Sequence, residues 1–147
     1  MKKLLTLSAI ALMGMAVISG CSKSSSSSPS YTMTATIAGK SFNGTNCIAS
    51  VAGGQLVVDG GAFTTATATY PYIALSVANY TGTVTYSFCG TTLNVAGIDS
   101  SASSLPVSQY GTITVTAASS TVISGTFSFT CSDSTKVTGG TFSAKVD

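Results

Sequence analysis

Apolar and hydroxyl-bearing residues alternate along most of the chain after residue 30. In residues 31–37 the apolar side chains fall on one face and threonines on the other, and the same period of two returns in 83–88, 111–116 and 122–131. A period of two places successive side chains on opposite faces of a strand, so each segment predicts a half-buried β-strand. No segment after residue 30 has helical periodicity.

Shorter apolar segments between turn signals predict the remaining strands. These segments are 41–51, 55–59, 72–77, 91–98 and 141–146. Gly53-Gly54 and Gly60-Gly61 are predicted to end strands, Gly125 to mark a bulge, and Ser-rich residues 99–108 to form a long loop. About eight or nine short strands predict an all-β fold, either an antiparallel β-sandwich or a small barrel, which strand number alone does not separate.

The N-terminus has the order of a secretory signal peptide. Met1-Lys2-Lys3 is basic, residues 4–18 are apolar, and Ile18-Ser19-Gly20-Cys21 follows. The apolar stretch is shorter than the 18 or more residues of a membrane-spanning helix. The segment resembles the lipobox of bacterial lipoproteins, which implies cleavage before Cys21 and acylation of that residue, with palmitate among the acyl groups.

The chain therefore divides into three parts. Residues 1–20 are predicted as the signal peptide, 21–30 as the lipidated cysteine with a Ser-rich tether, and 31–147 as a single all-β domain. The tether cannot bury apolar surface and reaches about 30 Å when extended. Ser22 carries no acidic retention signal, which favours lipid anchoring in the outer membrane and leaves its periplasmic or surface face open.

The charge balance excludes one class of partner. The formal charge of +2 counts Lys2 and Lys3, which the signal peptide removes; four lysines and four aspartates remain, with no Arg and no Glu. A near-neutral domain has no basic surface for nucleic acid, so we expect none as a partner.

Three cysteines remain after lipidation, and three pairings are possible. An exported chain is expected to form a disulfide. Cys131 is in phase with the apolar face of its strand, whereas Cys89 is out of phase and precedes Gly90. We therefore predict a Cys47–Cys131 disulfide and an outward-facing Cys89. Their spacing and the absence of His argue against a zinc site.

The sequence carries no catalytic constellation. Without His or Glu, Ser-His-Asp and Cys-His catalysis are excluded, and Asp59, Asp99 and Asp133 fall beside separate turns. Aspartate in a turn usually accepts a hydrogen bond from its own backbone. We expect no enzyme activity, no cofactor and no metal site.

Two surface features are candidates for binding or modification. Tyr70, Tyr72 and Tyr80, with Tyr110, lie near loops or strand ends, where aromatic rings could form a carbohydrate platform; alternatively they pack at sheet edges with their hydroxyls exposed to water. Asp133-Ser134-Thr135 resembles the O-glycosylation motif of bacteroidete envelope proteins, which implies a glycan on Ser134.

Several motifs, taken in order, resemble a family of small bacteroidete lipoproteins of unknown function. They are Met33-Thr-Ala-Thr-Ile-Ala-Gly-Lys40 with Phe42 (often Trp in that family), Tyr80-Thr-Gly-Thr-Val-Thr-Tyr86, Gly111-Thr-Ile-Thr-Val-Thr116, Ile123-Ser-Gly-Thr-Phe-Ser-Phe129 and Val137-Thr-Gly-Gly-Thr-Phe142. The resemblance implies the fold and the location, and no activity. Two function classes remain: a structural or protein-interaction lipoprotein, and a carbohydrate- or small-ligand-binding lipoprotein.

Overall fold

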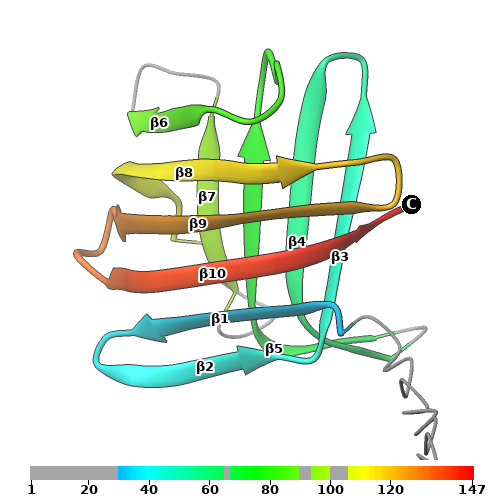
Figure 1. Ribbon diagram of the computed structural model, residues 1–147. Helices are drawn as coiled ribbons and strands as arrows, with labels where there is room; N and C mark the ends of the chain where they lie inside the picture. Colours follow the sequence, from blue (N-terminus) through cyan, green and yellow to red (C-terminus); the bar gives the residue numbers. More distant parts are fainter. Residues whose placement is uncertain (1–29, 65–66, 90–93, 100–105) are drawn as a thin grey trace, which may run out of the picture.

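The computed structural model describes residues 30–64, 67–89, 94–99 and 106–147, and of residues 62–64, 67–70 and 99 the backbone alone. These parts of the chain form ten β-strands and no helix (Figure 1). No helix there is long and apolar enough to cross a membrane. The strands are β1 (Thr32–Ile37), β2 (Lys40–Gly44), β3 (Asn46–Ala52), β4 (Gln55–Thr64), β5 (Thr67–Val77), β6 (Thr85–Cys89), β7 (Val95–Asp99), β8 (Ser108–Ala118), β9 (Val122–Cys131) and β10 (Lys136–Val146).

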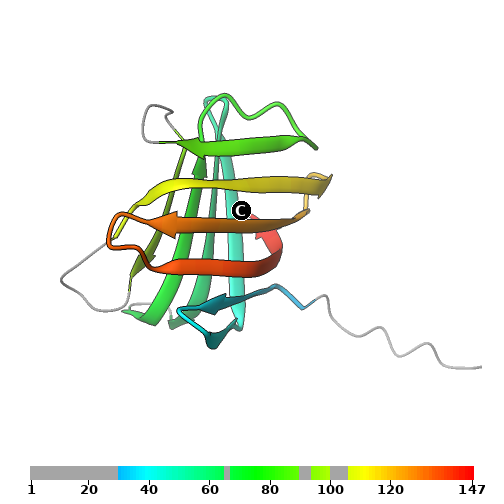
Figure 2. The same cartoon turned by 90° about the vertical axis from the view of Figure 1, so that its left-hand side faces the viewer.

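The strands form one sheet that folds over itself into two layers. The front layer has the order β6-β8-β9-β10-β1-β2 and the back layer β3-β4-β5-β7. The strands of the two layers cross, as Figures 1 and 2 show. A short parallel pairing of β10 with β3 joins the layers, and the other named pairings are antiparallel. The all-β prediction is confirmed, and the sheet is barrel-like, with β6 and β7 as the two ends of its path.

The core lies between the layers and follows the predicted period of two. Met33 of β1, Ile113 of β8 and Phe127 of β9 are buried, while the threonines beside them face outward. The described ladders and the described core lie within residues 32–147. A chain that begins at residue 22 therefore retains the whole described fold.

Four phenylalanines from three strands, β6, β9 and β10, form a row along the inner face of the front layer. Consecutive rings of Phe88, Phe129, Phe127 and Phe142 have centroids 6.2, 6.2 and 6.4 Å apart. Each ring has a glycine as its cross-strand partner: Gly111 pairs with both Phe88 and Phe129, Gly125 with Phe142, and Gly140 with Phe127. A glycine has no side chain, so the neighbouring ring can lie directly over its backbone.

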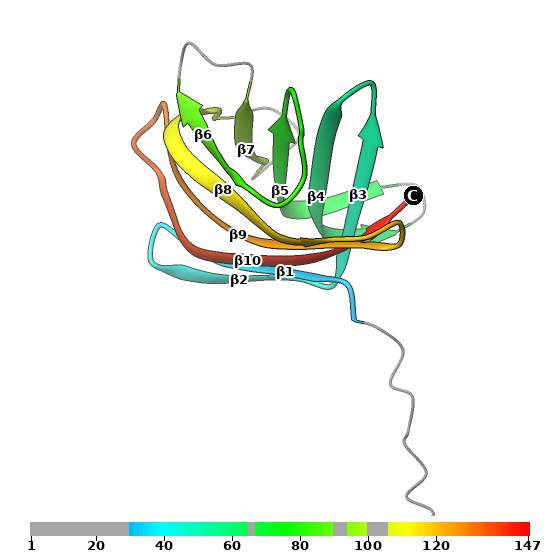
Figure 3. The ribbon, with the colours of Figure 1, turned by 45° about the horizontal axis from the view of Figure 1, so that its top comes forward.

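The bulge predicted at Gly125 lies on the neighbouring strand. Gly125 pairs regularly with Val115 and Phe142, and the register instead shifts between Val115 and Ala117 of β8. A second shift lies in β10, between Val137 and Gly140. Bulges bend a strand, and Figure 3 shows β8, β9 and β10 curving around the interior.

At the corner between the layers, the structure differs from two further predictions. The segment 41–51 is two strands, because the chain passes from front to back layer at Thr45. β4 does not end at Gly60-Gly61; it continues to Thr64 with a register shift between Gly60 and Ala62. A side chain at Gly44 would lie 2.9 Å from the nitrogen of Gly61, so these glycines allow two backbones to meet.

The side chain of Asn94 links the two ends of the sheet by hydrogen bonds. Asn94 precedes β7, and its Nδ2 donates a hydrogen bond of 3.0 Å to the carbonyl oxygen of Ser87 in β6. Its Oδ1 accepts one of 2.9 Å from the backbone nitrogen of Ala78, just after β5. Asn94 thus joins the front and back layers where the ladder itself does not close.

Candidate functional site

A groove of about 580 Å³ opens at one end of the barrel. It lies between the end of β3, the segment that follows β5, the β8–β9 hairpin and the end of β10. Its apolar wall consists of Val51, Ala118, Ile123 and Val146 together with the ring of Tyr80. Ligand sites in proteins are typically apolar hollows of this size range, so we name it the Tyr80 groove and treat it as the candidate site.

The polar groups of the Tyr80 groove are neutral. Thr81, Ser119 and Ser120 contribute hydroxyl groups, and none of the side chains that line the groove is charged. The Ser119 hydroxyl accepts hydrogen bonds from the backbone nitrogens of Val122 and Thr121, at 3.0 and 3.3 Å. The Ser119 hydroxyl therefore stabilises its own turn. The Thr81 hydroxyl lies 3.4 Å from that of Tyr86, and it and the Ser120 hydroxyl are the remaining hydroxyls that a ligand can contact.

The wall formed by residues 80–82 is fixed by hydrogen bonds. The backbone nitrogen of Tyr80 donates to the carbonyl oxygen of Gly54 in the β3–β4 turn, at 2.7 Å. The buried Tyr86 hydroxyl accepts a hydrogen bond from the Thr81 nitrogen and donates one to the Gly82 oxygen, each at 2.9 Å. This segment is therefore held against both layers of the sheet.

The opposite wall is fixed in the same way. The Val146 nitrogen donates to the Thr121 oxygen and the Asp147 nitrogen to the Ala49 oxygen, both at 3.0 Å. These bonds join the β8–β9 hairpin, the end of β10 and β3. A groove with walls held by backbone hydrogen bonds is largely formed before a ligand arrives.

The hydroxyl of Tyr80, the residue whose ring lines the groove, is an unusual polar group. It is buried and has no hydrogen-bond partner among the described residues. Its ring lies 6.0 Å from that of Tyr86, with the planes inclined by 37°. Burial, and then the neighbouring Tyr86, raises the pKa of Tyr80. A buried polar atom without a hydrogen-bond partner lowers the stability of the fold. Its retention at this position therefore indicates that it gains a partner when the protein is at work.

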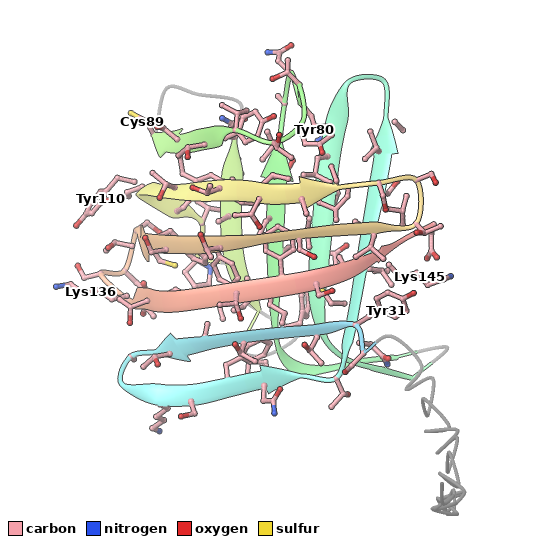
Figure 4. The ribbon with its side chains drawn as sticks, in the orientation of Figure 1. Tyr31, Tyr80, Cys89, Tyr110, Lys136 and Lys145 are labelled. Atoms are coloured by element: carbon pink, nitrogen blue, oxygen red, sulfur yellow. The ribbon has the colours of Figure 1, made fainter. Side chains whose placement is uncertain are left out.

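Among the described side chains, those of Tyr72, Tyr80 and Tyr110 lie in separate places. Tyr72 lies on β5 in the phase opposite to the buried Ile73 and Leu75, five residues or roughly 17 Å along the strand from its end at Val77. Tyr80 follows that end and lines the groove. Figure 4 shows Tyr80 at the top of the view and Tyr110 at the left margin. The side chain of Tyr70 lies outside the described residues.

Three wall residues were not identified from the sequence. Val51, Ile123 and Val146 are ordinary strand residues at the ends of three different strands. The period of two predicts that Ile123 and Val146 face inward. It does not indicate that the ends of β3, β9 and β10 meet around one hollow, because that depends on pairings distant in the sequence.

The predicted Cys47–Cys131 disulfide is wrong, since both residues are free thiols. Both are buried, but Cys47 lies in β3 of the back layer opposite Gly60, and Cys131 ends β9 of the front layer opposite Ser108. The strand phase predicts correctly that Cys131 points inward. It does not specify which inward residue of the other layer it meets. Cys89 is exposed at the end of β6, as predicted.

The raised pKa values of the two buried thiols, Cys47 and Cys131, predict that the fold loses stability at alkaline pH. Burial, with Asp59 as the second cause, raises the pKa of Cys47 from 9.0 to about 12; burial, with Asp133 second, raises that of Cys131 to about 11. Above pH 9 the unfolded chain therefore loses protons that the folded chain keeps, so the free energy of unfolding falls as the pH rises. Urea unfolding of residues 22–147 between pH 8 and about 11 measures this.

A matched pair of variants separates these thiols from other groups. The double variant Cys47→Ala, Cys131→Ala should flatten the alkaline decline, and Cys89→Ala should leave it unchanged. A thiol assay on the unfolded chain checks the pairing at the same time: all three cysteines are expected to react, whereas a Cys47–Cys131 disulfide would leave one.

The described carboxylates of Asp59 and Asp133 lie in separate elements, β4 and the β9–β10 turn. Asp133 accepts a 2.9 Å hydrogen bond from the Thr135 nitrogen, which lowers its pKa and confirms the predicted turn. Asp59 pairs with Ile48 and Ala74 across the back layer, and burial raises its pKa. The side chain of Asp99 lies outside the described residues. Within residues 30–147, as far as they are described, no three potential metal ligands come together.

Ser134 occupies the tip of the β9–β10 hairpin. Its side chain is exposed, its backbone has a φ of +69°, and its nitrogen donates a 2.9 Å hydrogen bond to the Cys131 oxygen. An exposed hydroxyl at a hairpin tip is accessible to a modifying enzyme. The predicted lipid attachment at Cys21, by contrast, lies outside the described residues.

Comparison with protein-family models, with curated proteins and with solved structures finds no match for this chain. The chemistry of the groove and the N-terminal sequence therefore carry the functional argument.

Proposed function

We propose that this chain is a non-enzymatic lipoprotein of the bacterial cell envelope that is anchored in the outer membrane through Cys21 and binds a neutral ligand in the Tyr80 groove. The order of basic, apolar and small residues before Cys21 supports the anchor. The resemblance to small bacteroidete lipoproteins supports the same location.

The observation that carries the binding proposal is the buried, unpartnered hydroxyl of Tyr80 beside a groove without charge. A chain selected for stability alone would have phenylalanine there, because an unsatisfied buried hydroxyl costs roughly 1–3 kcal/mol. A ligand oxygen that accepts a hydrogen bond from the Tyr80 hydroxyl would remove this cost in the bound state. The neutral lining favours an uncharged ligand, since a charged group would lose its hydration without gaining a counter-ion.

The absence of catalytic groups supports a binding role. The chain has no His and no Glu, and the described carboxylates of Asp59 and Asp133 lie in separate elements. Thr81 and Ser120 have no base beside them in the groove that could activate a hydroxyl.

A protein-interaction role is the second candidate, and a different surface favours it. On the outer face of the back layer, exposed Val95 and Val107 line a hollow of about 160 Å³ over Ala74 and Gly97, and exposed Ile48 lies on the same layer. Crosslinking in intact cells tests this role. Val95→Ser and Val107→Ser should remove a crosslinked partner that the wild-type chain captures, while Val84→Ser, at an exposed valine elsewhere, should not.

Tyr80→Phe is the variant that tests the groove. It should raise the free energy of unfolding of the chain by about 1 kcal/mol, because it removes an unsatisfied hydroxyl, and it should weaken ligand binding about tenfold. The readout is thermal unfolding of residues 22–147 alone and with uncharged sugars and alkyl glycosides, since a bound ligand raises the unfolding temperature.

Tyr110→Phe is the matched control, because Tyr110 is 58% exposed and lies outside the groove. It should change neither stability nor ligand response. If Tyr80→Phe instead destabilises the chain and leaves every ligand response intact, the hydroxyl has a structural partner and the groove loses its main support.

The intact mass of the native protein tests both proposed modifications. Cleavage before Cys21 with acylation gives a defined lipopeptide mass, and Cys21→Ser should abolish the lipid and release the chain from membranes. We also propose a glycan on the exposed Ser134. Additional mass that disappears in Ser134→Ala is expected, and a mass equal to peptide plus lipid would exclude the glycan.

A further inference from the structure

The tether enters the fold beside the Tyr80 groove. Thr32 of β1 pairs with Ser143 of β10, so Tyr31 lies next to the last residues of β10, where Val146 lines the groove. Figure 4 shows Tyr31 and Lys145 at the same side of the molecule. With strands about 4.8 Å apart and roughly 3.3 Å per residue, Tyr31 and Val146 are within about 10 Å of each other.

This placement relates the groove to the membrane. This inference rests on the proposed function, in which the lipid on Cys21 lies in one leaflet of the outer membrane. Ten peptide units join Cys21 to Tyr31 in the sequence, a reach of at most about 35 Å. The tether therefore joins the domain at the end of the barrel that carries the groove, which keeps that end within about 35 Å of the lipid, and molecules of that bilayer are the ligands at highest local concentration.

The lining of the groove selects among such molecules. Val51, Ile123 and Val146 offer apolar surface, and burying it against an alkyl chain gains about 25 cal/mol per Å². A sugar without an alkyl chain would leave the apolar surface of these three residues exposed to water. A hydrocarbon alone would leave the Tyr80 hydroxyl unpaired. A charged head group would meet only neutral hydroxyls of Thr81 and Ser120.

We propose that the Tyr80 groove binds a neutral amphiphile of the membrane. Its alkyl chain lies along Val51, Ile123 and Val146, and its hydroxylated head group bonds to Thr81, Ser120 and the Tyr80 hydroxyl. Because protein atoms cover that hydroxyl, a ligand oxygen reaches it only if the Tyr80 ring shifts. The ring is therefore the part of the site that moves on binding.

Calorimetric titration of residues 22–147 with three probes tests the ligand class. Octyl β-glucoside, below its critical micelle concentration, should bind saturably. Glucose, which has the same head group without the chain, and octyl sulfate, which has the chain with a charged head, should bind at least about tenfold more weakly.

A pair of valine variants locates the binding. Val51 is 44% exposed in the groove wall and Val84 is 46% exposed outside it, so neither substitution buries a new charge in the core. Val51→Asp should weaken octyl glucoside binding at least about tenfold, and Val84→Asp should leave it unchanged.

The outcomes separate this inference from the proposed function. Glucose binding as tightly as octyl glucoside, with a loss in Tyr80→Phe, would retain the neutral-ligand site and overturn the amphiphile. Octyl glucoside binding that Val51→Asp does not weaken would also overturn it, since the contact would lie elsewhere. Failure of all neutral probes would overturn both proposals.

Discussion

Gly125→Ala is expected to lower the free energy of unfolding by about 3 kcal/mol, and Gly125→Val to prevent folding, because the position has no room for a side chain. A Cβ atom at Gly125 would collide with the carbonyl oxygen of Thr114 and would lie 2.7 Å from the ring of Phe142. The first contact is with backbone, so no change of rotamer relieves it. Relief requires β8 and β9 to separate, which breaks their ladder.

Urea unfolding of residues 22–147 measures this loss. Gly53→Asn is the matched control, because nothing lies within 4 Å of a Cβ there and asparagine tolerates its φ of +58°. It should change stability by less than about 0.5 kcal/mol. Adding Phe142→Leu to Gly125→Ala should not restore stability, because the Thr114 oxygen remains. A loss below about 1 kcal/mol for Gly125→Ala would contradict this packing.

Met33→Ala is expected to cost about 4 kcal/mol, in the upper part of the range for truncating a buried side chain. Met33 is fully buried at the corner where the two layers meet, and it covers the backbone of Gly60. A Cβ at Gly60 would lie 2.5 Å from both the Cβ and the Sδ atoms of Met33. Since Gly60 has no side chain that could move into the space, the cavity left by truncation stays open.

Met33→Leu is the control for this position. Leucine nearly conserves the volume and should cost less than about 1.5 kcal/mol. Denaturant midpoints for both variants, with unchanged slopes, report the difference. If Met33→Ala and Met33→Leu lowered the free energy of unfolding by the same small amount, the surrounding residues would have closed the cavity. Met33 would then not be needed to hold the two layers together.

Strand phase could be predicted from the sequence wherever one face of a strand is buried. The alternation in β1, β8 and β9 identifies their inward residues, and it places Cys131 inside and Cys89 outside. In these strands a slip by one residue would expose the whole apolar set, so a local pattern is sufficient.

The structural role of a glycine is less predictable from the sequence than strand phase, because glycine occurs both in turns and where two backbones meet. Gly53-Gly54 forms a hairpin turn with positive φ values, as predicted. Gly60-Gly61 looks similar in the sequence, yet it lies within β4 at a close approach of two layers. What distinguishes the two pairs is whether another backbone approaches, and that depends on Gly44 and Met33, which lie more than a dozen residues away.

The candidate site was predicted only in part. Tyr80 was among the predicted binding residues, but its expected partners Tyr70 and Tyr72 belong to β5, and the described Tyr72 does not line the groove. The groove is formed by turns and strand ends from four separate segments. The pairing of β10 with β3 and the hydrogen bond from the Tyr80 nitrogen to the Gly54 oxygen bring those segments to one end of the barrel, and neither has a local signature in the sequence.

The most direct test of the account is to observe the tyrosine rings of residues 22–147 by NMR during titration with octyl β-glucoside. The ring resonances of Tyr80, and of Tyr86 packed against it, are expected to shift with saturation, together with the amides of Val51 and Ser120. The rings of Tyr72 and Tyr110 should not respond. Shifts confined to Tyr72 or Tyr110, or no saturable shift at all, would contradict the claim that the Tyr80 groove is the binding site.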